Sequence, residues 1–260
     1  MNDSGPLWDL VGRLLSGDAG ALELAASVEL FEAVPTSGLE FGERHVAAFE
    51  MDVWPWVSAW ASAEGLRGGD VCGHLVELRS RWGLTGDEAD DVGALCRTAA
   101  EMEAEPRGTF VRRFLSPWLP SLHSALALRG SVFQASLVEV ALEMAVVEGP
   151  AEWSWGPTPQ RWSHLLLPRR AGVFLSRARL CAIGSALEVP VSPGPRSVSF
   201  RDLVEGAGVR GRGGQLVAAL RAELAGERAA LEAWGRRGAK VAAATSALDA
   251  SDAYLAAEAP

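Results

Sequence analysis

Apolar residues recur along this chain at the three- and four-residue spacing of an amphipathic α-helix. Such spacing gathers apolar side chains on one helix face, which then packs against a shared core. Alternation with a period of two, the pattern of a half-buried strand, occurs only in short pieces such as residues 197–200. The five clearest faces are Leu7, Leu10, Val11, Leu14 and Leu15; Val71, Leu75, Leu78 and Trp82; Val92, Leu95, Ala99 and Met102; Phe133, Leu137, Val140, Met144 and Val147; and Val217, Leu220, Leu224, Leu231 and Trp234. The pattern predicts an all-α protein with more than about 60% helix, where roughly a third is usual.

Glycine and proline residues divide the helical segments, and the richest break is residues 149–160, GPAEWSWGPTPQ. We therefore expect a main helical domain at residues 1–150 and a C-terminal helical segment at residues 151–243. Residues 244–260 lack large apolar anchors, so we expect a mobile tail there.

Composition and charge exclude several classes of function. The formal net charge is −9, and Lys240 is the only lysine among 24 basic residues. Such a chain offers few of the clustered cations that phosphate contacts need, so we expect no nucleic-acid partner. No run of 18 apolar residues occurs, and Asp3 stands where a signal peptide carries basic charge. We expect a cytoplasmic protein that does not insert into a membrane.

The sequence offers little for catalysis or metal binding. Cys72, Cys96 and Cys181 are widely spaced within helical patterns, and neither they nor the four histidines have the spacing of metal ligands. The acidic run at residues 87–91 superficially resembles the magnesium-diphosphate motif of terpenoid synthases. That chemistry needs a second metal motif, and we find none. We therefore expect no enzyme activity, metal or cofactor.

An acidic stretch and a group of tryptophans are the candidate binding elements. Residues 86–105 contain seven acids against one basic residue, Arg97. Paired carboxylates suit the guanidinium fork of a basic partner, although acids at the start of a helix also favour its dipole. Trp54, Trp56 and Trp60 could line an apolar groove. Trp60 fits a core position better, whereas Trp56 follows a proline in a loop and is the better surface candidate.

Two further features lie near and beyond the central break. Trp153 and Trp155 stand in the Gly/Pro-rich loop, where an exposed tryptophan is costly unless it docks on something. Residues 161–213 carry nine arginines against three acids. This segment could close over the acidic stretch or meet an acidic client surface, and the sequence leaves both possibilities open.

The stretch at residues 110–122, FVRRFLSPWLPSL, combines large aromatics with a helix start. Phe110 and Phe114 lie one turn apart, and Ser116 can cap a new helix that Trp118 continues. Taken alone, this pattern predicts core packing. It also resembles the Phe-Leu-x-x-His-Leu-x-x-Trp-x-Pro-x-Phe segment of the TorD family of redox-enzyme maturation chaperones, which includes DmsD- and NarJ-like proteins. Phe114 stands where that segment has its histidine.

Other stretches follow in the order of that family, so the resemblance spans roughly residues 40–190. They are residues 43–49 (ERHVAAF), similar to a Glu-His-x-x-Leu-Phe helix; residues 55–60 (PWVSAW), similar to a Pro-Tyr-Glu-Ser-Val-Tyr loop; residues 90–93 (DDVG), similar to Asp-His-Ile-Gly; and residues 174–190, similar to a C-terminal segment of some members. Two departures stand out: Asp91 replaces the family's histidine, and Trp56 replaces its tyrosine.

The resemblance implies a TorD-like helical bundle with a C-terminal helical extension and no cofactor of its own. Such chaperones bind an immature molybdenum-cofactor oxidoreductase subunit, often through its twin-arginine signal peptide, and assist cofactor insertion before export. The client-binding residues that it implies here are Asp90, Asp91, Trp56, Trp60, His45 and Trp118. The alternative is a helical scaffold or regulatory module that binds a cytosolic partner protein and has no role in export.

Overall fold

The computed structural model describes residues 4–61, 69–81, 89–149, 161–192, 194–236 and 242–258. The prediction of an all-α protein is confirmed: helices make up 77% of the structure, and no strand occurs in the described ranges. The only extended pairing within those ranges is an isolated antiparallel bridge between Trp56 and Asp91.

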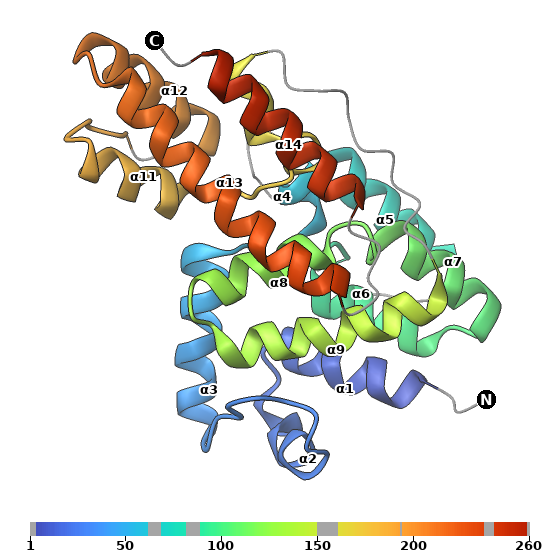
Figure 1. The fold of residues 1–260 in the computed structure, drawn as a ribbon. Coiled ribbons are helices and arrows are strands. Elements are labelled where there is room, and N and C mark those ends of the chain that lie inside the picture. The colour runs from blue at the N-terminus through green and yellow to red at the C-terminus, as the bar shows by residue number, and fades with distance from the viewer. Residues whose placement is uncertain are drawn as a thin grey trace.

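The first part of the chain forms a bundle of mostly short helices (Figure 1). They are α1 (Gly5–Leu15), the 3-10 turn η1 (Ala19–Ala21), α2 (Leu22–Ser27), α3 (Gly38–His45), the π-helical η2 (Val46–Asp52), α4 (Val57–Ala61), α5 (Gly69–Arg81), α6 (Val92–Glu101), α7 (Ala104–Phe114), α8 (Leu119–Leu128) and α9 (Val132–Glu148). The second part forms the 3-10 turn η3 (Trp162–Leu166), α10 (Pro168–Ala171), α11 (Arg177–Ala186), α12 (Arg196–Val209), α13 (Gly213–Arg236) and α14 (Ala242–Ala257).

Local sequence signals explain several helix boundaries. Ser37 caps α3 by accepting the Glu40 N–H at 3.2 Å, and Ser176 caps α11 in the same way. The predicted cap at Ser116 is wrong. A turn intervenes, and α8 begins at Leu119 with a proline in its first turn, where a missing N–H costs little.

Two clusters of buried apolar residues lie on either side of the break at residues 149–160. The first is formed mainly by α1, α3 and α6 to α9, and the second by the helices from η3 onward. Phe174 and Trp234 come from the second part of the chain but belong to the first cluster. The long helix α13 therefore contributes to both cores, and Figure 1 shows it running from α12 across to α8.

The expectation of a mobile tail at residues 244–260 is wrong for the described part of that range. Helix α14 packs along α13 and α10, with Leu248 and Leu255 buried. Arg221 Nε also pairs with the Asp252 carboxylate at 2.6 Å and ties α14 to α13. The packed face is rich in alanine, which allows close approach of helices but gives a weak hydrophobic signal in the sequence.

Helices α1 and α6 approach closely because glycine lies at their contact. A Cβ added to Gly93 would lie 2.3 Å from Ser16 Oγ and 2.5 Å from the Gly12 carbonyl oxygen. No other residue fits at Gly93 without separating the helices. This contact fixes the first turn of α6, the turn that carries the DDVG stretch.

Candidate functional site

Three of the five stretches that carry the family resemblance meet around Trp60, which is buried in the first core cluster. The Trp60 ring lies 5.8 Å from that of Trp118, at the start of α8. On another side it stacks at 4.5 Å on Phe174, which precedes α11. Its indole N–H donates to the Trp54 carbonyl oxygen at 3.1 Å. Three segments far apart in the sequence thus share one aromatic centre.

A fourth segment joins this centre through backbone hydrogen bonds. The Val57 N–H donates to the Asp90 carbonyl oxygen at 2.9 Å, and the Val92 N–H donates to the Pro55 carbonyl oxygen at 2.8 Å. Residues 55–57 and 90–92 therefore run side by side, and the PWVSAW loop is held against the DDVG stretch. We call residues 54–60 with residues 90–93 the loop junction.

Asp90 and Asp91 are buried inside the loop junction. Asp90 is 0% exposed and its carboxylate accepts the Ser58 hydroxyl, while Asp91 is 4% exposed. Asp91 caps α6, because its Oδ1 accepts the N–H groups of Gly93 at 2.8 Å and Ala94 at 3.1 Å. The picture of two exposed carboxylates facing a basic ligand is therefore wrong. Both acids instead fix the shape of the loop, and the acids at residues 87 and 88 lie outside the described residues.

Trp54 and Trp56 are the accessible aromatics of the loop junction. Both are half-buried, and their ring centroids lie 5.6 Å apart. Trp60 and Trp118 lie beneath the surface at 1% and 2% exposure, so they support the junction and do not offer a contact surface. Among the predicted residues, Trp56 is the one that a ligand can reach from this junction.

His45 belongs to a separate aromatic group at the end of α3. Its ring lies 5.9 Å from that of Phe41 and 5.1 Å from that of Phe49. Both rings are buried in the first core cluster, so His45 packs against that core from the end of α3.

Sequence reasoning missed an exposed apolar face that runs from α3 into the start of η2. Leu39 is 77% exposed and Val46 is 42% exposed, and with neighbouring small residues they line a shallow groove of about 550 Å³. Glu43 also lines this groove. The signal in the sequence was an apolar pair seven residues apart, which reads equally well as a core face.

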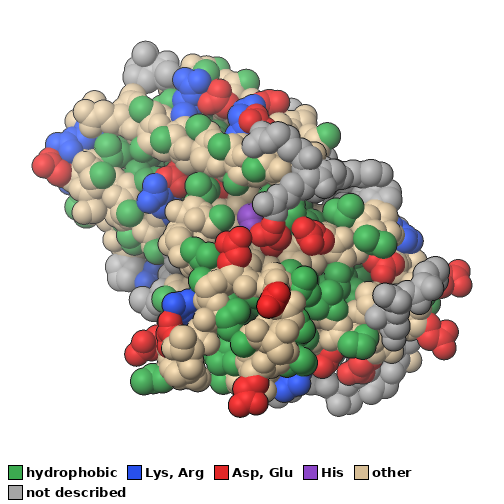
Figure 2. Space-filling view, turned by 60° about the horizontal axis from the view of Figure 1, so that its bottom comes forward, with side chains coloured by type: hydrophobic (Ala, Val, Ile, Leu, Met, Phe, Trp, Pro, Cys, Tyr) green, Lys and Arg blue, Asp and Glu red, His purple; other side chains and the backbone are tan. Residues whose placement is uncertain are grey.

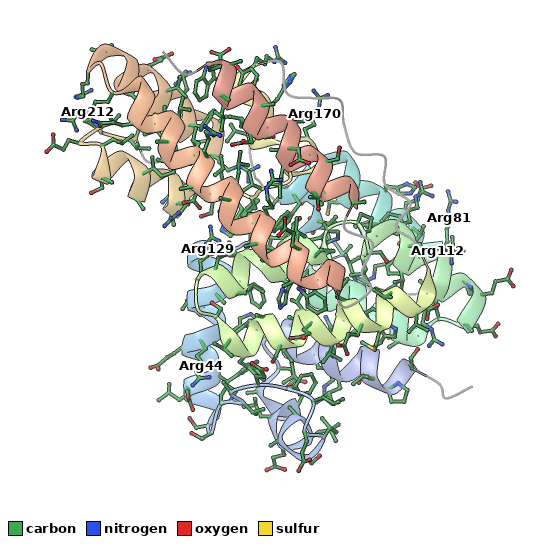
Figure 3. The ribbon with its side chains drawn as sticks, viewed as in Figure 1. Arg44, Arg81, Arg112, Arg129, Arg170 and Arg212 are labelled. Atoms are coloured by element: carbon green, nitrogen blue, oxygen red, sulfur yellow. The ribbon has the colours of Figure 1, made fainter. Side chains whose placement is uncertain are left out.

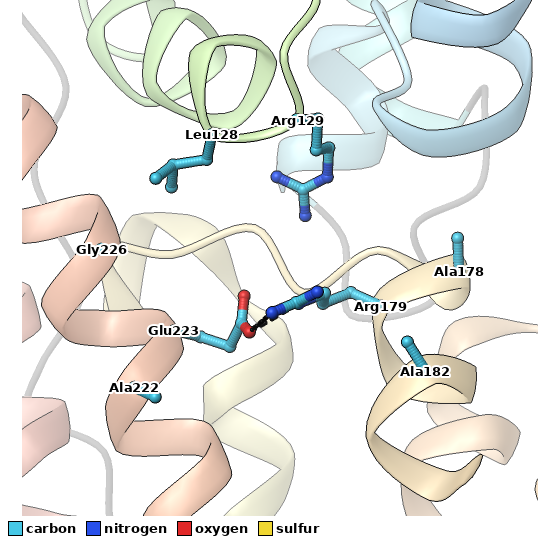
Figure 4. Close-up of a pocket in the computed structure, with 8 residues that line it drawn as sticks. All are labelled: Leu128, Arg129, Ala178, Arg179, Ala182, Ala222, Glu223 and Gly226. Carbon is cyan, nitrogen blue, oxygen red and sulfur yellow. Dashed lines mark hydrogen bonds and ion pairs between the residues drawn. The ribbon is translucent and has the colours of Figure 1, made fainter. Parts of the chain in front are cut away.

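A second hollow lies between the end of α8 and helices α11 and α13 (Figure 4). Its volume is about 380 Å³, and small residues of both helices line it. Arg129 points into it from α8, toward the ion pair that Arg179 makes with Glu223. This charged hollow lies where the two parts of the chain meet.

In the described part of the chain, no group of three or more His, Cys, Asp or Glu side chains is placed to hold a metal ion. Cys96 is buried, and that burial raises the pKa of its thiol well above the usual range. No helix in the described ranges is long and apolar enough to cross a membrane.

No protein-family model, curated protein or solved structure matches the chain. The functional assignment therefore rests on the residues and contacts described above.

Proposed function

We propose that the protein is a chaperone that binds a basic-then-apolar segment of an immature client protein. The resemblance to the TorD family gives the client class: a molybdenum-cofactor oxidoreductase subunit, held through its twin-arginine signal peptide while the cofactor is inserted before export. The observation that supports the proposal is that four of the five resembling stretches meet at the loop junction.

Trp56 is the residue that we expect to contact the client. Its ring packs on Trp54 and its backbone is bridged to Asp91, so its position is largely set before binding. A contact residue that is already ordered loses little conformational entropy when a ligand binds. Tryptophan is also among the residues most often found to dominate binding energy at interfaces. Asp90 and Asp91 are positioning residues in this scheme.

The surface charge of the protein suits a basic ligand. Acidic side chains predominate over Lys and Arg on the lower part of the face in Figure 2. The net charge of −9 acts in the same direction. Such a field raises the association rate of a cationic peptide, and salt screens it beyond a Debye length of about 8 Å at physiological ionic strength.

Calorimetric titration of the full chain with a synthetic peptide tests the proposal. The peptide carries two arginines followed by an apolar run, and a matched peptide carries lysines in their place. We expect the arginine peptide to bind more tightly, since a guanidinium group is less strongly hydrated than an ammonium group and stacks on aromatic rings such as that of Trp56. Trp56→Ala should weaken binding by about 30-fold, the equivalent of about 2 kcal/mol. Val209→Ala, at an apolar position 87% exposed on α12, is the control.

The same titration also distinguishes the role of Asp91 from that of Trp56. Asp91→Asn should change the affinity less than Trp56→Ala, because asparagine caps a helix about as well as aspartate. Absence of binding by the arginine peptide, or equal binding by wild type and Trp56→Ala, would overturn the proposal.

The alternative is a scaffold or regulatory module that binds a cytosolic partner without a role in export. The exposed Leu39 on α3 and Val46 at the start of η2 favour it, because an apolar helix face of this kind can receive a partner helix. A partner whose affinity depends on Leu39 and not on Trp56 would support this alternative.

A further inference from the structure

Most arginines of the Arg-rich segment, residues 161–213, are held by contacts within the molecule. Arg179 pairs with Glu223; Arg212 pairs with Glu188; Arg201 lies 3.9 Å from the Asp202 carboxylate; Arg196 donates to the Leu166 carbonyl oxygen at 2.6 Å; and Arg210 donates to the Gly206 carbonyl oxygen at 3.3 Å. These contacts indicate that most of these arginines bind groups within the protein. They therefore argue against a surface that meets an acidic client. Arg161 and Arg170 behave differently.

Arg161 and Arg170 converge on one atom, the Nε2 of His164. Arg161 Nε donates to this nitrogen at 3.0 Å, and Arg170 Nη1 lies 3.3 Å from it. A ring nitrogen offers a single lone pair, so it accepts one good hydrogen bond and not two. One guanidinium group is therefore left without a full acceptor at this point.

The charged groups that the structure describes in this cluster are positive. Partial burial and the positive charges of Arg170 and Arg161 lower the pKa of His164, so the imidazole is neutral near pH 7. Within the described ranges, no carboxylate lies within ion-pair distance of Arg161 or Arg170. Among the described residues, two like charges thus approach one another with no carboxylate paired to either, which is unfavourable unless an anion binds.

The cluster stands on an ordered base. His164 belongs to η3, where the neighbouring Leu165 and Leu166 are buried in the second core cluster. Arg170 belongs to α10, whose last residue, Ala171, is buried and accepts a hydrogen bond from α14. Figure 3 places Arg170 beside α14, well away from Arg44 on α3. The two cations are therefore held near one another by the fold.

We propose that Arg161, His164 and Arg170 form a binding site for a phosphate group. Two planar guanidinium forks match the oxygens of a phosphate in geometry and charge, and an oxygen between them would give each arginine the acceptor that it now shares. The phosphate is either the free ion or a small phosphate monoester, since both present the same dianionic group. The site involves no residue of the loop junction and does not depend on the proposed client.

Calorimetric titration of the full chain at constant ionic strength tests the site with two probes, inorganic phosphate and phenyl phosphate. We expect saturable binding of at least one probe. Arg161→Gln and Arg170→Gln should each weaken it by about tenfold, the usual cost of losing a hydrogen bond to a charged group. Arg177→Gln removes an arginine of the same segment outside the cluster and should leave the affinity unchanged.

The two probes also identify the source of the phosphate. Tighter binding of phenyl phosphate supports a monoester ligand, and binding of inorganic phosphate alone supports the free ion. No binding of either probe overturns the proposal. An equal loss of affinity in all three arginine variants also overturns it, because that result describes attraction by overall charge. Far-ultraviolet circular dichroism of each variant shows whether an affinity loss reflects lost helix.

Discussion

Glu227, on α13, leads us to expect that this protein loses stability as pH rises through the neutral range. Its side chain is buried at 2% exposure, and burial raises its carboxyl pKa from 4.5 to about 8. Glu223 raises the pKa further, while Arg129 opposes the shift. Between these two pKa values the folded protein holds a proton that the unfolded chain has lost. The free energy of unfolding therefore falls as pH rises from about 4.5 to 8.

The size of the effect follows from the pKa shift. Each pKa unit corresponds to about 1.4 kcal/mol, and pH 7 lies about 2.5 units above the unfolded pKa. Ionisation of Glu227 in the unfolded chain should therefore cost about 3 kcal/mol of stability at pH 7, a large part of the roughly 5–15 kcal/mol that is usual for a folded protein. Glu227→Gln keeps the shape of the side chain and carries no charge. It should exceed wild type by a little under about 1 kcal/mol near pH 5 and by about 3 kcal/mol near pH 7.

Urea unfolding followed by tryptophan fluorescence at several pH values between 5 and 8 measures this difference. Glu232→Gln, at an exposed position on the same helix, is the control and should follow wild type. The charged groups on the helices around α13 are the same in all three proteins, so their effects on stability cancel in the comparison. These groups are His123 of α8, Arg129 at its end, Arg179 of α11, and Asp249 and Asp252 of α14. If wild type and Glu227→Gln lose stability in parallel, the reasoning about the buried proton is refuted.

Three substitutions test the loop junction and its support by urea unfolding at neutral pH. Trp60→Ala should lower the free energy of unfolding by about 3–5 kcal/mol, because it empties the aromatic centre; a loss under about 1 kcal/mol would contradict the packing described. Asp91→Ala should cost about 1–2 kcal/mol through the lost helix cap, whereas an unchanged midpoint would mean that the cap contributes nothing. Gly93→Ala should cost about 1–3 kcal/mol through overpacking against α1. Its matched control, Gly73→Ala in open space on α5, should instead stabilise by up to about 1 kcal/mol, and similar signs at the two glycines would contradict this account.

The helical class of the fold was predictable because it depends on local periodicity. The apolar faces at residues 133–147 and 217–234 appear as the buried sides of α9 and α13, except at Val147, which is 87% exposed. Helix α14 was missed because much of its packed face is alanine, which gives a weak hydrophobic signal in the sequence. Alanine is large enough to fill the contact only because α14 lies close to α13, and this closeness arises when the chain folds.

The candidate site was predictable only in part. The sequence left open whether the acids near residue 90 face a ligand or favour a helix start, and the capping of α6 by Asp91 agrees with the second reading. The burial of Asp90 depends on the PWVSAW loop lying across it, a pairing between segments distant in the sequence that spacing alone does not reveal. Likewise, composition identifies an arginine-rich segment, but the structure is needed to separate Arg161 and Arg170 from the arginines that have acidic partners.

The position of α13 in both cores has a consequence for cooperativity. This helix of 24 residues is about 36 Å long and carries Trp234 near its end, where the indole N–H donates to His123 of α8. Phe174 reaches the same core from the other part of the chain. A chain ending at residue 149 would lack both aromatics, so neither part keeps a complete interior alone. The two parts should unfold in a single transition, and a ligand that stabilises one of them should also raise the melting temperature of the other.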